Sequence, residues 1–181
     1  MPDQEQTNGA EAAQLTRNKD GSIRKTFVKS VARRIETADA AGLRALVGDL
    51  HESDMGALIE ALPPEQRPRL VELLGIDFDF TALTEVDDVV RDEILEELPP
   101  KAVAKGVSEL ESDDAVAILE DLPKAEQAEI LEQLPQPERG AVVRSLDYPE
   151  DSAGRRMQAE FIAVPPSCLA GYYAGADGRP A

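Results

Sequence analysis

The chain has 181 residues, and its 36 acidic and 19 basic side chains give a formal net charge of −17. A surface this negative repels nucleic acid and anionic lipid and attracts cations, so we expect no nucleic-acid partner. The single cysteine, Cys168, excludes an intrachain disulfide and favours the reducing cytoplasm. No uncharged run reaches the roughly twenty apolar residues of a spanning helix, so we expect no direct membrane span.

The N-terminal part divides into a polar tail, residues 1–20, and a basic amphipathic helix, residues 21–36. The tail has too little apolar content to fold and is expected to be disordered. The helix is predicted from apolar residues at a spacing of four, surrounded by arginines and lysines: Ile23, Phe27, Val31 and Ile35. Such a helix can lie on an anionic membrane or grip nucleic acid. We favour the interpretation that its apolar stripe caps the domain that follows.

Residues 37–157 are dominated by an internal repeat of twelve residues. Each unit carries three apolar residues at positions i, i+1 and i+4, which form one stripe of an α-helix. The stripes end at Leu50, Leu62, Leu74, Val86, Leu98, Leu110, Leu122, Leu134 and Leu146. Of the 27 stripe positions 26 are hydrophobic, and Gly106 is the exception. This regularity predicts a series of helical units that end near the listed residues.

Residues that break helices follow most of the stripes. They include Pro63-Pro64, Pro99-Pro100, Pro123 and Pro135. Proline cannot continue a helix but fits its first turn, so each unit is predicted to be a helix of about nine residues and a tight turn. Helices this short are unstable alone in water and must bury their stripes on one another. The predicted fold class is therefore all-α, a right-handed superhelix (solenoid) of short helices with a 12-residue repeat.

The C-terminal part no longer follows the repeat. Residues 158–166 contain the β-type run Phe161–Val164, which we interpret as a linker and an orphan strand. Residues 167–181 are rich in glycine and alanine and form an aperiodic tail.

Candidate catalytic residues are scarce, and we do not expect an enzyme. The only histidine, His51, has no metal-ligand spacing around it and is interpreted as a surface residue. Carboxylates occur in clusters, such as Asp113-Asp114 at a predicted helix start. Acids at helix starts ordinarily cap free amides and complement the helix dipole. The alternative interpretation is a surface for a hard cation such as Mg²⁺, which one or two carboxylates hold.

The string that closes the repeats, residues 147–157 (DYPEDSAGRRM), and the β-type run after it resemble a junction in MgtE-type magnesium transporters. In that family the junction joins the cytosolic N-terminal helical domain to the first strand of a CBS-domain pair. The repeats with their Leu-Pro punctuation are similar to the same N domain, so the resemblance covers roughly residues 37–166. The repeats alone are less specific, because flagellar motor switch proteins have similar helical units. A helical-repeat interaction scaffold of that kind is the alternative function.

The resemblance implies a cytosolic Mg²⁺-sensing domain that regulates a magnesium transporter of the inner membrane. Its partners would be the CBS-domain pair and the transmembrane part, and Mg²⁺ bound between acidic surfaces would hold the pore shut. The family's metal-binding acids match Asp113 and Asp114, with weak binding shared with a partner domain. Two further family acids fall at Ala117 and Thr81. After Pro166 the chain departs from the family, so we expect a truncated copy that cannot transport by itself.

Overall fold

The computed structural model describes residues 16–158, and apart from one isolated bridge between Arg17 and Ile23 every regular element there is a helix. The elements are α2 (Lys25–Glu36), α3 (Ala40–Val47), α4 (Glu52–Ala61), η1 (Pro64–Gln66), α5 (Arg67–Leu74), η2 (Gly75–Asp77), η3 (Phe80–Glu85), α6 (Asp88–Glu97), α7 (Pro100–Val107), α8 (Ser112–Leu119), α9 (Lys124–Gln133), α10 (Gln136–Leu146) and α11 (Ala153–Arg156). The predicted all-α class is confirmed for this part of the chain. None of its helices is long and apolar enough to cross a membrane.

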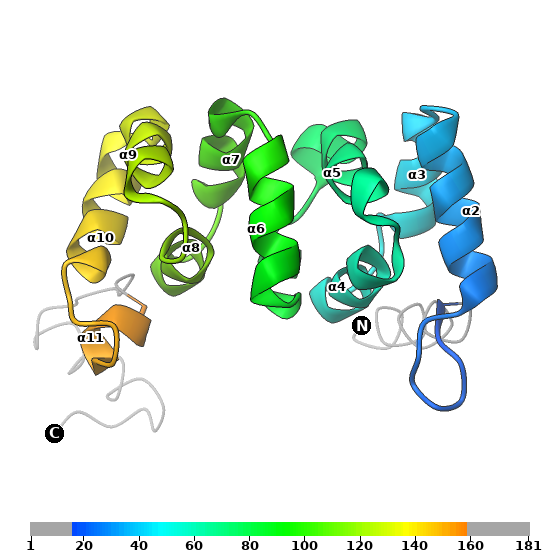
Figure 1. Ribbon diagram of the computed structural model, residues 1–181, viewed down its shortest axis with the longest axis horizontal. Helices are drawn as coiled ribbons and strands as arrows, with labels where there is room; N and C mark the ends of the chain where they lie inside the picture. Colours follow the sequence, from blue (N-terminus) through cyan, green and yellow to red (C-terminus); the bar gives the residue numbers. More distant parts are fainter. Residues whose placement is uncertain (1–15, 159–181) are drawn as a thin grey trace, which may run out of the picture.

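The helices form an elongated row that runs from α2 and α3 at one end to α9, α10 and α11 at the other (Figure 1). Several of them pack on the element two repeat units further along the chain: α4 on η3, α7 on α9, and α8 on α10. This arrangement explains how helices of eight to ten residues persist, because each buries its stripe on neighbours about two repeat units away. The handedness of the superhelix stays a prediction.

The residues that end the predicted stripes form the spine of the core. Six of the nine are buried, namely Leu62, Leu74, Val86, Leu98, Leu122 and Leu134, and the other three pack against the core half-buried. Three of the α-helices end in such a leucine in extended conformation: Leu62, Leu98 and Leu134. A proline follows each of these leucines and disfavours the α conformation for the residue before it. The predicted helix ends at these positions are confirmed.

The unit that ends at Val86 is where the structure departs from the predicted pattern. An α-helix was expected there, but the chain forms the two 3-10 segments η2 and η3. Phe78 and Phe80 are both buried and meet edge to face, with ring centroids 5.4 Å apart. Two residues apart, they can share one apolar environment because Phe78 and Asp79 are extended. In this unit the packing of the two aromatic rings therefore replaces the expected α-helical stripe.

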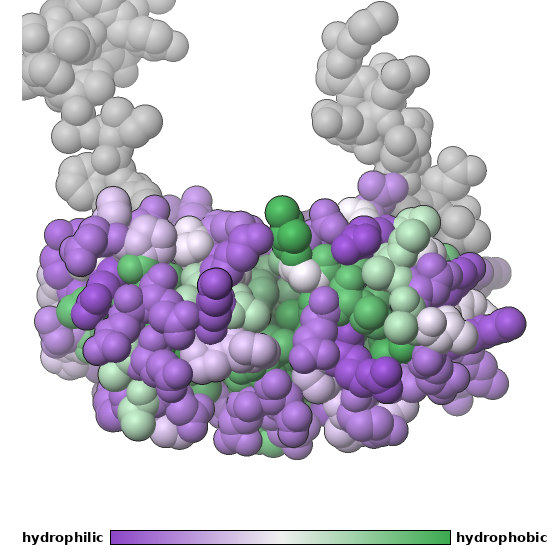
Figure 2. Space-filling model, turned by 90° about the horizontal axis from the view of Figure 1, so that it is seen from above, coloured by the Kyte–Doolittle hydropathy of each residue, from purple (hydrophilic) through white to green (hydrophobic). Residues whose placement is uncertain are grey.

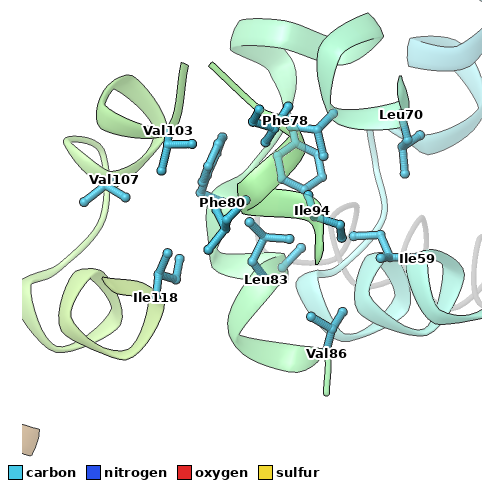
Figure 3. Packing of buried hydrophobic residues seen from close by; sticks show 14 of the residues in the cluster. Ile59, Leu70, Phe78, Phe80, Leu83, Val86, Ile94, Val103, Val107 and Ile118 are labelled. Atoms are coloured by element: carbon cyan, nitrogen blue, oxygen red, sulfur yellow. The ribbon is translucent and has the colours of Figure 1, made fainter. Parts of the chain in front are cut away.

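The same pair accounts for the one gap in the stripes, Gly106. A Cβ atom on Gly106 would overlap the ring of Phe80. The phenylalanine thus fills the volume that a large side chain at position 106 fills in the other units. Figure 3 shows Phe80 lying between the segment that holds Val103 and Val107 and the buried Leu83.

The basic helix lies at the first end of the row and covers it as predicted. Val31 and Ile35 of α2 are fully buried, and α2 packs on α3 and α5. The helix begins at Lys25 and not at Gly21, because residues 16–24 form a turn in which Thr16 is buried and Arg17 pairs with Asp54. Residues 16–20, which were predicted to belong to a disordered tail, are thus part of the described structure. Residues 1–15, the predicted strand after residue 158, and Cys168 lie outside the described residues.

Candidate metal site

The acid pair predicted to bind metal lies in the first turn of α8. Asp113 and Asp114 follow Glu111, which stands at the N-cap position but makes no capping hydrogen bond with its side chain. Negative charge is favourable at this end of a helix because the free backbone amides carry partial positive charge. This dipole interaction explains why acids are tolerated here whether or not a cation binds.

Burial and neighbouring charge act against the ionised form of Asp114. Its pKa is raised above the ordinary value, first by burial and then by the charges of Asp113, Glu111, Glu52 and Asp79. The Oδ1 atom of Asp113 is covered by protein and has no hydrogen-bond partner in the part of the chain that the structure describes. A bound cation would give the covered oxygen of Asp113 a partner. It would also offset the repulsion between the two carboxylates.

The charges around Asp114 come from three different segments. Glu52 belongs to the first turn of α4, Asp79 is the N-cap of η3, and Glu111 precedes α8. They share one region because η3 packs on both α4 and α8. The carboxylates are not gathered into a ligand cage, since residues 16–158 contain no group of three or more potential metal ligands close enough to hold an ion. Within the described residues Asp113 and Asp114 are thus an acid pair without a third ligand close by.

The two positions where the resembling family has further acids take other roles. Thr81 lies in η3, where its backbone amide donates to the Asp79 carboxylate over 2.9 Å. Ala117 lines a polar hollow of about 330 Å³ together with Arg91 and Glu120. Arg91 is 95 % buried by residue area (5 % exposed) and pairs with Asp121 at 2.7 Å. Beside Ala117 the carboxylates are therefore neutralised by the guanidinium of Arg91.

Residues 147–157, the string that resembles the family junction, pack on the end of α8 through α11. Arg155 is only 4 % exposed, and its Nε donates to Glu120 over 3.2 Å. Arg156 reaches the other oxygen of the same carboxylate at 2.6 Å. Arg155 also donates to the carbonyl oxygens of Leu146 and Tyr148. Helix α8 therefore carries the acid pair at its start and holds the closing segment at its end.

Polar residues that are buried or half-buried in this way were missed by sequence reasoning, although a signal exists. Arg67, Arg91 and Gln127 stand three residues before an apolar triplet, so they extend its stripe into the core. Gln127 donates to the Leu119 carbonyl over 2.8 Å, and Arg67 donates to the carbonyls of Ile59 and Leu62. Gln127 and Arg67 thus bind free carbonyl groups at the ends of earlier helices, whereas Arg91 pairs with the Asp121 carboxylate. A polar residue on an apolar stripe therefore indicates a buried polar contact with another part of the chain.

His51 has a structural role at the start of α4. It is the N-cap residue, and its Nδ1 accepts a hydrogen bond from the backbone amide of Ser53 over 3.3 Å. The side chain is mostly exposed, which confirms the prediction of a surface residue.

The chain is similar to a known protein family and to a solved structure. The model of a family described as "MgtE intracellular N domain" matches residues 50–151. A solved structure titled "Crystal structure of the soluble part of a magnesium transporter" aligns with a TM-score of 0.62 and 24 % sequence identity, over 76 % of this chain and 55 % of that one. At this identity the likeness speaks for the fold alone, and the chain spans about half the length of that protein. None of the curated proteins matches.

Proposed function

Since this chain belongs to the MgtE intracellular N domain family, we propose that it is the cytosolic Mg²⁺-sensing part of a magnesium transporter of the inner membrane. The observation that carries the proposal is the state of Asp113 and Asp114. One has a covered oxygen without a partner, and the other has a pKa raised by burial and by like charges. Both features disfavour two bare carboxylates, and a divalent cation offsets both.

The domain acts through a metal that it shares with a partner. Mg²⁺ keeps several waters and is held by one or two carboxylates, so an open pair on one surface suits a site that a second acidic surface completes. The partner in this proposal is a CBS-domain pair, which links the domain to the transmembrane part. With Mg²⁺ bound the two surfaces pack together and the pore is shut. When Mg²⁺ falls, carboxylate repulsion separates them.

Titration of the chain with Mg²⁺, followed by NMR of the backbone amides, tests the metal contact. We expect weak binding with shifts concentrated at residues 111–115, because the pair supplies only part of a coordination shell. The double variant Asp113→Asn/Asp114→Asn should abolish these shifts. The control Glu96→Gln/Glu97→Gln removes the same charge from an exposed pair on α6 and should leave them unchanged. Equal loss in both double variants would mean that the response is a diffuse charge effect.

Calorimetry and thermal melting separate the proposal from its alternatives. A stoichiometric micromolar Mg²⁺ site on this chain alone would contradict a site shared with a partner. We expect Mg²⁺ to raise the melting temperature more than Na⁺ at equal ionic strength, because a divalent ion relieves local repulsion that screening only weakens. A chain that responds identically to both salts would favour the interaction scaffold, related to motor switch proteins, over a metal sensor.

A further inference from the structure

Basic residues are concentrated at one end of an otherwise acidic molecule. Residues 16–36 hold seven basic and two acidic side chains, whereas residues 37–158 hold 11 basic and 29 acidic ones. Helix α2 carries most of these seven and closes one end of the row (Figure 1), and hydrophilic residues are prominent at this end in the view from above (Figure 2). The net charge of −17 therefore conceals a positive end that an anionic partner can approach.

Three of the basic residues form a ridge along one side of α2. Lys25, Lys29 and Arg33 follow one another at a spacing of four residues, so they lie on the same side of the helix, and we call them the basic ridge. All three are exposed, and none of them pairs with a carboxylate between residues 16 and 158. By contrast, Arg34 of the same helix pairs with Asp39. The ridge thus presents three positive charges that the described part of the chain does not neutralise.

The apolar side of α2 is already used by the fold. Val31 and Ile35 are fully buried, and Ile23 and Phe27 pack half-buried against the core. The helix therefore cannot immerse its apolar stripe in a bilayer, as interfacial amphipathic helices do. What it offers to a partner is the charged ridge and the surface next to it.

A hollow of mixed character lies beside the ridge, between α2 and the end of α3. Its volume is about 440 Å³. Thr26 and Ser30, each directly after a lysine of the ridge, supply hydroxyl groups, and Phe27 and Leu46 supply apolar walls. Asp49 is the one charged residue of the lining. Positive charge next to hydroxyl groups and an apolar recess matches an anionic amphiphile, whose head group would meet the ridge and whose apolar part would enter the hollow.

We propose that the basic ridge and this hollow bind the anionic lipids of a membrane surface. The inference rests in part on the proposed function, since a domain that belongs to a transporter stays close to a bilayer, but it does not involve Mg²⁺. Attraction between basic residues and anionic lipid falls off within a Debye length, about 10 Å at moderate ionic strength. The carboxylates of α6 to α10 lie several helices further along the row (Figure 1), so salt screens their repulsion while the ridge stays in contact. The row meets the membrane with the end that α2 closes.

Co-sedimentation with lipid vesicles tests this surface. Vesicles of equimolar phosphatidylglycerol and phosphatidylcholine are compared with vesicles of phosphatidylcholine alone, and EDTA is present throughout. We expect weak binding to the anionic vesicles, none to the neutral ones, and release at high salt. A chain that shows no preference for the anionic vesicles would overturn the proposal. Because EDTA removes divalent ions, this failure is distinct from a failure of the Mg²⁺ titration.

Removal of charge locates the contact. The triple variant Lys25→Gln/Lys29→Gln/Arg33→Gln should lower the affinity for anionic vesicles at least about tenfold, because each basic residue near the surface contributes to it. The matched control removes three exposed positive charges from α7 and α10 and should leave the affinity nearly unchanged: Lys101→Gln, Lys105→Gln and Arg144→Gln. Thermal melting verifies that both variants are folded. Equal losses would show a diffuse effect of charge and refute the ridge as the binding surface.

A second pair of variants tests the hollow and separates a membrane from nucleic acid. Ala45→Asp places an acid in the lining of the hollow and should weaken vesicle binding several-fold, whereas Ala41→Asp adds the same charge to an exposed position of α3 outside the lining. Equal effects would contradict a role of the hollow. Single-stranded RNA uses phosphate contacts and has no need of the hollow. If such an RNA bound more tightly than the vesicles, and the ridge variant lost it, the ridge would be a nucleic-acid surface and the proposal would be wrong.

Discussion

The Nε atom of Arg155 donates a hydrogen bond to Glu120 over 3.2 Å and thereby ties the closing turn of the chain to the end of α8. The two residues are 35 positions apart in sequence, and each is largely buried. The helix that offers the acid pair Asp113 and Asp114 at its start is therefore fixed at its other end by the segment that leads out of the domain.

We predict that Arg155→Met destabilises the fold strongly. It leaves the buried Glu120 with Arg156 alone and removes the donor to two carbonyl groups, so we expect a loss of about 3 kcal/mol in the free energy of unfolding. Chemical denaturation measures it. Arg144→Met, at an exposed position on the neighbouring α10, should change stability by less than about 0.5 kcal/mol. Similar losses in both variants would mean that the contacts of Arg155 with Glu120 and the two carbonyl groups do not stabilise the fold.

Two glycine substitutions should act in opposite directions. Gly106→Ala places a Cβ against the ring of Phe80 and should cost about 1–3 kcal/mol through overpacking, despite the better helix propensity of alanine. Gly140→Ala in α10 meets nothing within 4 Å and should stabilise by up to about 1 kcal/mol. Urea unfolding of both variants checks this. Combining Gly106→Ala with Phe80→Leu should recover part of the loss, and a strictly additive double variant would contradict the contact.

The stripe residues should behave as core residues and their neighbours should not. Leu98→Ala and Leu122→Ala each remove a side chain that is at least 95 % buried and should cost about 2–5 kcal/mol as cavities. Glu96→Gln, which lies off the stripe on an exposed face of α6, should change stability by less than about 0.5 kcal/mol. Thermal and chemical unfolding of the three variants decide whether the twelve-residue stripe is the structural unit.

Asp114 should make stability depend on pH in the unusual direction for an acid. Its pKa is raised in the folded state, first by burial, so the unfolded chain ionises at lower pH than the folded one. Ionisation of Asp114 therefore destabilises the fold. This destabilisation is absent below the unfolded pKa near 3.8 and is fully present above the folded pKa. Asp114→Asn should stabilise the protein at neutral pH, with a gain that vanishes in acid. Denaturation curves across this pH range measure the gain.

Asp39 supplies the control with the opposite sign. The amide of Gly42 and then Arg34 hold its pKa below the ordinary value, so its charge stabilises the fold above pH 3.8, and this contribution is lost as the pH falls through the folded pKa. Asp39→Asn should therefore destabilise at neutral pH and converge with wild type in acid. If both aspartate variants moved stability in the same direction, the assignment of the two environments would be incorrect.

The sequence by itself determined the helical units and most of their ends. Stripe residues such as Leu62 and Leu98 belong to apolar triplets whose spacing places them on one side of a helix. The prolines after them end the helix through local steric clashes. These are short-range effects, which a single sequence contains in full. The amphipathic basic helix was predictable for the same reason, although the turn before it, anchored by Arg17 on Asp54, was not.

The tertiary structure decided what depends on contacts between distant residues. Gly106 is small because Phe80, 26 positions earlier, fills its volume, and neither residue alone predicts that contact. The burial of Arg91 and Arg155 likewise depends on carboxylates from other helices, since an isolated guanidinium in the core would be prohibitively costly. Besides burial and the nearby Asp113 and Glu111, the charges of Glu52 and Asp79 raise the pKa of Asp114 only because η3 packs on both α4 and α8. Local sequence encodes periodicity, but the environment of a charge is set by what folding places beside it.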